Sequence, residues 1–272
     1  MITEIFAYSF LVRAFCVGLF VSVSASLLGV SLVLRRFSMI GDGLSHVGFG
    51  ALGISALLAL QPMIVTIPVV ILSAFILLRV SGRNHNGDSA IALISSSALA
   101  VGVIAVSTAG VNTDLNSFLF GSILSVSRSD GIVAAVLSLV TILSYLMFYH
   151  QIYTTTFDPV FAKATGINTG RYTALLALLT ALVIVVGMRI LGSLLISSLI
   201  IFPAAVAMKL GKTYLSVSVI SACEAVVAFV IGFFLSYAFS LPTGASIVVI
   251  HMFIFIAASI VKYCRINFAT GK

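Results

Sequence analysis

The chain has 272 residues, of which only 14 are basic and 7 are acidic, so charged side chains make up 8% of it. Apolar residues make up 61%, whereas a soluble domain has about 45–50% apolar and about 25% charged residues. This composition excludes a soluble globular enzyme, a nucleic-acid-binding domain and a disordered chain, because it supplies too little polar surface. The class that remains is a polytopic membrane protein.

Nine apolar runs follow one another along the chain, and each is long enough to cross the membrane as a helix. A helix needs about 20 residues to span about 30 Å of hydrocarbon, and these runs are too long for barrel strands. The predicted fold class is therefore all-α. The nine ranges are 9–33, 40–60, 62–80, 89–110, 131–151, 171–188, 190–208, 214–238 and 243–262.

Basic residues divide unevenly between the two sides of this arrangement. Only Arg13, Arg128 and Arg189 fall on one side, and the other 11 of the 14 fall on the opposite side. Because Lys and Arg concentrate in cytoplasmic loops, the split predicts a cytoplasmic C-terminus and, with nine spans, an outside N-terminus. The larger group is Arg35, Arg36, Arg79, Arg83, Lys163, Arg171, Lys209, Lys212, Lys262, Arg265 and Lys272.

Small residues recur in the first two spans. Gly18, Ser22 and Ser26 are spaced by four in the first span, and the range 48–53 of the second span carries three glycines. Such spacing lets helix backbones approach closely, so close packing is the expected role. Room for a pathway beside the second helix is the alternative.

Four ionisable residues lie inside predicted spans: Asp42, His46, Glu224 and His251. Charged groups are costly in hydrocarbon, so we hypothesise that these four residues have a function there. Counted from the nearest basic anchors at 1.5 Å per residue, the last three lie roughly 15–18 Å deep, near the midplane. Asp42 shares a helix face with His46, four residues on. Carboxylate and imidazole ligands suit a divalent transition metal such as zinc, manganese or ferrous iron.

Each of these residues also has a structural interpretation. Asp42 could cap the second helix after the Arg35-Arg36 turn, and Glu224 could serve a structural hydrogen bond. His251 fits a satisfied core histidine as well as it fits a ligand.

A short amphipathic segment follows the fifth span. Asp158-Pro159 suits a helix start, because proline is favoured in the first turn and aspartate at the N-cap. Phe157, Phe161 and Ala164 are expected on one face. The segment is either a docking element or an interfacial anchor, and its shortness and weak basicity favour docking.

The sequence offers no nucleotide-binding loop of its own. Gly211-Lys212-Thr213 has the ending of a phosphate-binding loop, but the glycine needed five residues earlier is Val206. If ATP powers transport, a separate subunit must hydrolyse it.

Four segments together resemble the signatures of metal-ion ABC permeases, the membrane subunits of zinc, manganese and iron importers. The resemblance covers most of the chain, in order. The segments are LRRFSMIGDGLSH (34–46), FLFGSILSVS (118–127), FDPVFAKATGI (157–167) and GMRILG running on to IFPAA (187–205).

This resemblance implies a fold similar to the permeases of cobalamin and siderophore importers, in the lipid of the bacterial plasma (inner) membrane. It implies one transmembrane permease domain, 1–272, paired as a homodimer. A cytoplasmic ABC ATPase dimer and an extracytoplasmic metal-binding protein are the expected partners. The chain is then a transport subunit and not an enzyme, without a permanent cofactor.

The resemblance also assigns roles to residues. It implies that Asp42 and His46 coordinate the metal with Glu224 as a carboxylate partner, whereas His251 replaces an aliphatic residue of many relatives. It implies a cytoplasmic coupling helix over about 157–169. The residues expected to contact the ATPase are Phe157, Asp158, Pro159, Phe161, Ala162, Lys163 and Gly166.

The transported metal is left open between three ions. Two histidines favour zinc, while the carboxylates leave manganese and iron as alternatives. A secondary metal transporter, driven by a proton or sodium gradient, could use the same buried ligands. It would have no need of the Asp158 helix and would often carry inverted repeats, of which none is evident here.

Overall fold

The computed structural model describes residues 8–81, 87–110 and 128–270, and every element within these ranges is a helix. Each of the nine predicted spans coincides with one of them, within a few residues except at the C-terminal end of the last. The nine are α2 (Ser9–Leu34), α3 (Ile40–Leu57), α4 (Pro62–Ser81), α5 (Gly87–Ala109), α7 (Arg128–Met147), α10 (Thr169–Leu191), α11 (Ser193–Leu210), α12 (Tyr214–Phe239) and α13 (Thr243–Thr270). The predicted all-α polytopic fold is confirmed.

Seven of these helices are long and apolar enough, by length and composition, to cross a membrane. The other two of the nine are α3, which carries Asp42 and His46 among several glycines, and α11, whose described apolar run Leu195–Leu210 is shorter. Two short helices, α8 (Tyr149–Phe157) and α9 (Pro159–Ala164), connect α7 to α10.

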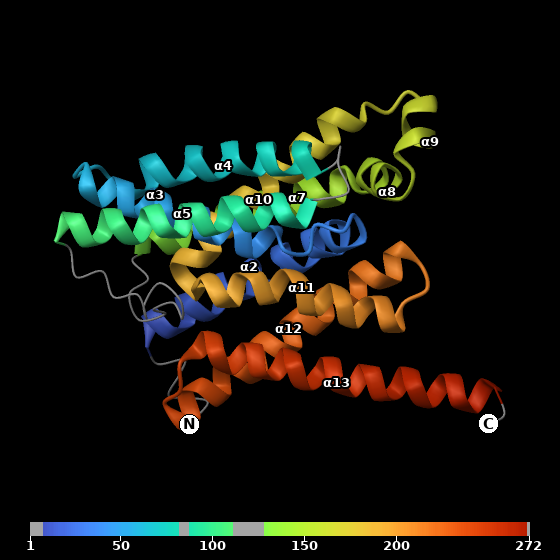
Figure 1. Ribbon diagram of the computed structural model, residues 1–272. Helices are drawn as coiled ribbons and strands as arrows, with labels where there is room; N and C mark the ends of the chain where they lie inside the picture. The colour runs from blue at the N-terminus through green and yellow to red at the C-terminus, as the bar shows by residue number, and fades with distance from the viewer. Residues whose placement is uncertain (1–7, 82–86, 111–127, 271–272) are drawn as a thin grey trace.

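Helix α2 lies at the centre of the bundle and packs against α7, α10, α11 and α12 (Figure 1). Helices α3, α4 and α5 form one side of the molecule, and α12 and α13 form the other. Helix α11 lies between them and contacts both α3 and α13. The short helices α8 and α9 protrude at one end.

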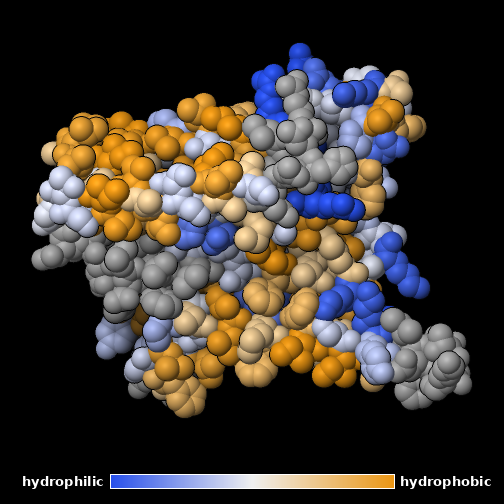
Figure 2. Space-filling view, viewed as in Figure 1, coloured by the Kyte–Doolittle hydropathy of each residue, from blue (hydrophilic) through white to orange (hydrophobic). Residues whose placement is uncertain are grey.

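The outer helices expose apolar side chains, as a bilayer requires. Only 22–28% of the apolar membrane-spanning stretch is buried in α4, α5, α7 and α13, whereas 72% of it is buried in α2. Figure 2 shows hydrophobic residues over the sides of the helices, and strongly hydrophilic residues near α8 and α9. An apolar exterior of this kind is solvated by lipid chains.

Charged contacts agree with the predicted course of the chain. An Arg189 nitrogen lies 3.2 Å from an Asp130 oxygen, which joins the end of α10 to the start of α7. The Arg13 side chain, near the start of α2, lies directly against Gly131. Two of the three arginines predicted for the minority side therefore lie beside the first turn of α7, at the same end of the bundle.

The glycines of α3 serve close packing, which confirms the first of the two interpretations. A Cβ atom on Gly50 would lie 2.6 Å from the Ala98 carbonyl oxygen, and one on Gly53 would lie 2.7 Å from that of Gly102. Any side chain there would push α5 away from α3. In α2, Gly18 faces the Phe229 ring and the Ser26 carbonyl accepts a hydrogen bond from Ser221, so its small face packs on α12.

Candidate metal site and coupling segment

Asp42 and His46 form an open pair on α3. Asp42 Oδ2 lies 3.6 Å from His46 Nε2, and the side chains are 42% and 22% exposed, respectively. That separation is too long for a hydrogen bond. Two ligands that are each about 2.1 Å from one metal ion are about 3.4 Å apart in tetrahedral geometry, so the spacing suits a shared cation.

The carboxylate of Asp42 does not cap α3, so the capping interpretation is wrong. Met39 occupies the N-cap position, and no side chain caps this helix. Asp42 lies in the first turn, where the helix dipole favours a negative charge. Its carboxylate is therefore available to a ligand, and Nδ1 of His46 is buried without a hydrogen-bond partner among the described residues.

Glu224 of α12 and His251 of α13 form a closed pair. His251 Nδ1 lies 2.9 Å from Glu224 Oε1, and the side chains are 0% and 4% exposed for His251 and Glu224. The Phe202 ring of α11 stacks on the imidazole at 6.0 Å between centroids. Glu224 Oε2 and His251 Nε2 are buried without hydrogen-bond partners within the described chain. This geometry agrees with the structural interpretations of both residues, a structural hydrogen bond for Glu224 and a core histidine for His251.

The four residues do not converge on one site within the chain. Among the residues that the structure describes, no three His, Cys, Asp or Glu side chains lie close enough to hold a metal together. Residue spacing estimates depth along a helix but leaves its neighbours undetermined. The sequence predicts similar depths for these groups, but within one chain α11 packs between α3 and α13 and keeps the two pairs apart.

The coupling segment contains one short helix, α9, which has 6 residues and is capped at both ends. The Asp158 carboxylate accepts hydrogen bonds from the amides of Val160, at 3.0 Å, and Phe161, at 2.9 Å. At the other end Gly166 adopts a left-handed φ of 83°. The Ile167 amide donates to the Ala162 carbonyl at 2.8 Å, which closes the helix in a Schellman motif.

The helix is shorter than the predicted range of about 157–169. Phe157 ends α8, Asp158 is extended at φ −141° and ψ 88°, and α10 does not begin until Thr169. Phe157 and Phe161 therefore belong to different helices and form no common face along one axis. The large hydrophobic residues of α9 that are exposed are Val160 and Phe161, at 78% and 57%, while Ala162 is fully buried.

An aromatic clasp, absent from the sequence-based predictions, ties α8 to the bundle. It comprises Tyr145, Tyr149, Tyr153, Phe157 and Tyr214. The rings at 149, 153 and 157 lie 5.3, 5.1 and 5.9 Å from the Tyr214 ring. The Tyr214 hydroxyl lies 2.7 Å from those of both Tyr145 and Ser31, which links α12 to α7 and α2. The first four of these aromatic residues are spaced four apart in the sequence, and this spacing could have indicated that their rings share one helix face.

A bundle with seven helices of membrane length and composition among its described residues defines a multi-span membrane protein. The sequence matches the model of the ABC 3 transport family over residues 7–262, and the chain belongs to that family. It is 32% identical to the manganese import system permease protein ScaB of Streptococcus gordonii, over 92% of this chain and 91% of the relative.

Two further similarities extend this result. The chain is 28% identical to the high-affinity zinc uptake system membrane protein ZnuB of Haemophilus influenzae, over 92% of this chain and 96% of ZnuB. The solved structure of PsaBC from Streptococcus pneumoniae in complex with Fab contains a chain that is 32% identical. It superposes with a TM-score of 0.83, covering 95% of both chains.

These matches confirm the predicted class, a membrane permease of a metal-ion ABC importer. They favour a transport subunit over an enzyme and give no support to a secondary transporter. One of the four family-like segments, Phe118–Ser127, lies outside the described residues.

Breaking the closed pair should destabilise the protein. His251→Leu leaves the Glu224 carboxylate buried and unpaired, which should lower the free energy of unfolding by about 3–5 kcal/mol. The double variant Glu224→Leu/His251→Leu should recover most of that loss, because it leaves no buried charge. Thermal unfolding in detergent measures both. Equal stability of His251→Leu and the unmodified chain would contradict a closed pair.

Proposed function

We propose that this chain is the permease subunit of an ATP-driven importer whose substrate is divalent manganese. The observation that carries the proposal is the open Asp42–His46 pair. A carboxylate that is 42% exposed on a helix of a membrane bundle is costly unless it faces water or a cation. A metal ion passing along α3 removes that cost.

The choice of manganese over zinc follows from the relatives more than from the ligands. His251 is sequestered with Glu224, so the open pair offers as many carboxylates as imidazoles, and carboxylate ligands suit manganese. ScaB, a manganese permease by name, is also more similar than ZnuB, at 32% against 28% identity. Zinc is the second candidate.

A homodimer completes the site in this proposal. One open pair supplies two ligands, which are too few to hold a transition metal. Two copies with their α3 helices facing each other would supply two carboxylates and two imidazoles. The extracytoplasmic partner would deliver the ion to this path, and the uneven distribution of Lys and Arg supports a cytoplasmic C-terminus.

A cytoplasmic ABC ATPase would dock on α9, whose exposed Val160 and Phe161 offer an apolar contact. The aromatic clasp then provides a route for its motion, because α8 leads directly into α9 and packs on Tyr214. Tyr214 begins α12, the helix that carries Glu224 ten residues later. Displacement of α9 would therefore reach the core of the bundle.

The metal site can be tested by uptake. Asp42→Ala and His46→Ala should each reduce uptake of radioactive manganese by more than about tenfold in proteoliposomes that contain the ATPase, because each removes a ligand. Tyr263→Ala, at an exposed residue of α13 outside α3 and the clasp, is the control and should transport normally. Normal uptake by both α3 variants would sink the assignment.

Docking and coupling should separate in a second pair of variants. Phe161→Ala should lose co-purification of the ATPase, because it truncates the exposed contact of α9. Tyr214→Ala should keep the ATPase bound but lower the metal transported per ATP, since the clasp is broken, whereas Tyr214→Phe keeps the ring and should lose less. Tyr263→Ala, at an exposed tyrosine of α13, is the control. Fully coupled transport by Tyr214→Ala would refute the route.

A further inference from the structure

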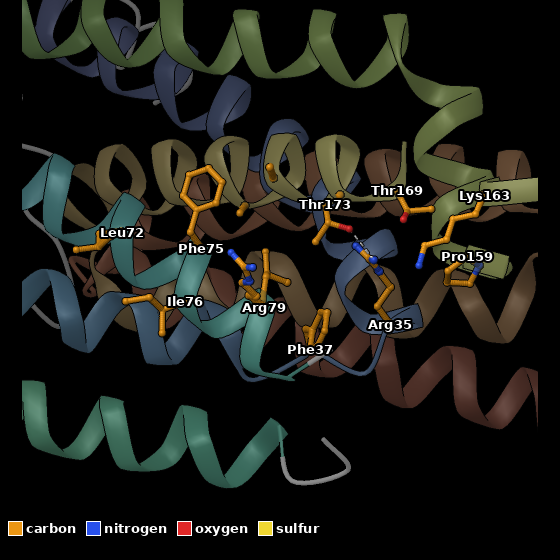
Figure 3. A pocket seen from close by; sticks show the side chains of 14 residues that line it. Arg35, Phe37, Leu72, Phe75, Ile76, Arg79, Pro159, Lys163, Thr169 and Thr173 are labelled. Carbon is orange, nitrogen blue, oxygen red and sulfur yellow. Dashed lines mark hydrogen bonds between the residues drawn. The ribbon is translucent and has the colours of Figure 1, made fainter. Parts of the chain in front are cut away.

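A cavity of about 800 Å³ lies beside the coupling helix, apart from both acid–imidazole pairs (Figure 3). Its walls come from the turn after α2, the second half of α4, α9 and the first turns of α10. Segments far apart in the sequence thus enclose one space at the end of the bundle where α9 lies.

Three cations line this cavity: Arg35, Arg79 and Lys163. No acidic side chain is among the described residues that line it. Figure 3 shows Arg35 and Lys163 reaching towards each other, with Arg79 on the α4 side. Like charges gathered in one cavity repel one another, so an anion bound among them is favoured.

Arg35 is held in place rather than free to turn into solvent. Its Nη2 donates a hydrogen bond to Thr173 Oγ1 at 3.0 Å, and its guanidinium carbon lies 5.9 Å from the centre of the Phe37 ring. Burial lowers the pKa of Arg35, which reflects the lost hydration of its charge. A counter-ion in the cavity would restore the lost stabilisation.

The remaining wall is apolar and faces outward. Leu72, Phe75 and Ile76 of α4 line the cavity and are 62%, 37% and 45% exposed. Helix α4 is a candidate membrane span, and only 28% of its apolar stretch is buried. This wall of the cavity therefore continues into the lipid-facing surface. The cavity therefore joins a cationic end to an apolar side.

We propose that this cavity binds one anionic phospholipid, with its phosphate among Arg35, Arg79 and Lys163 and its acyl chains along Leu72, Phe75 and Ile76. Basic pockets between membrane helices bind anionic headgroups in this way. The site requires only that the chain lies in a membrane and does not depend on which metal is carried. Lys163 and Pro159 belong to α9, so the bound lipid also steadies the coupling helix.

Other occupants fit the cavity less well. A second copy of this chain has only 7 acids to offer. Of these, Glu224 pairs with His251, Asp130 pairs with Arg189, and Asp158 caps its own helix. A cytoplasmic ATPase could supply carboxylates but could not reach Leu72, in the middle of a membrane helix. An anionic lipid satisfies both the charges and the apolar wall.

The test uses the delipidated permease–ATPase complex in detergent, titrated with dioleoyl phosphatidylglycerol, dioleoyl phosphatidylcholine or inorganic phosphate. Native mass spectrometry counts the bound lipids. Each basic residue contributes about fivefold in affinity for an anionic headgroup, so Arg79→Gln/Lys163→Gln should bind phosphatidylglycerol about 25-fold more weakly. Lys212→Gln/Lys262→Gln removes two exposed charges outside the cavity and should bind as the unmodified chain does.

A second variant tests the apolar wall without touching charge or coupling. Phe75→Ala should also weaken phosphatidylglycerol binding, whereas inorganic phosphate should not compete with the lipid at equal concentration. Equal binding of the two lipids, or unchanged binding by Arg79→Gln/Lys163→Gln, would overturn the proposal. The permease without the ATPase is titrated in parallel, and lipid binding by the permease alone but not by the complex would show that the ATPase occupies the cavity, which also overturns the proposal.

Discussion

A bilayer offers no water to a charged side chain, so every acid inside it needs a partner or a cation. Asp42 of α3 and Glu224 of α12 are two such acids, and each lies beside a histidine. The two pairs differ in whether the acid and the histidine are hydrogen-bonded to each other, and the proposed site depends on that difference. Glu224 and His251 are hydrogen-bonded and closed, whereas Asp42 and His46 are 3.6 Å apart and open.

In this account the closed pair contributes to stability, and the open pair is proposed to serve transport. A closed pair that is fully buried adds a polar constraint between α12 and α13, and an ion would have to break it to enter. In the proposed function, the open pair would bind and release a cation without unfolding its surroundings. Helix α11 lies beside both, since Ile200 packs at Gly41, the residue before Asp42, and Phe202 stacks on His251. One helix thus packs near both pairs.

The nine spans could be predicted from the sequence because membrane helices are recognised by their length and hydropathy, which are local properties of the sequence. The sequence also placed Asp42 and His46 on one face, since that follows from helix geometry. The separation of Glu224 and His251 from that pair could not be predicted, because spacing sets depth and leaves open which helices are neighbours. The extent of α9 was missed for a local reason: Asp158 is extended and breaks the helix after Phe157.

The central claim is that the ion passes at the open pair of α3. Anomalous scattering at the manganese absorption edge, from crystals of the permease–ATPase complex soaked in Mn²⁺, tests it most directly. The account predicts a peak within bonding distance of an Asp42 oxygen and a His46 nitrogen. A peak found only between Glu224 and His251, or none near Asp42 when the site is saturated, would contradict it.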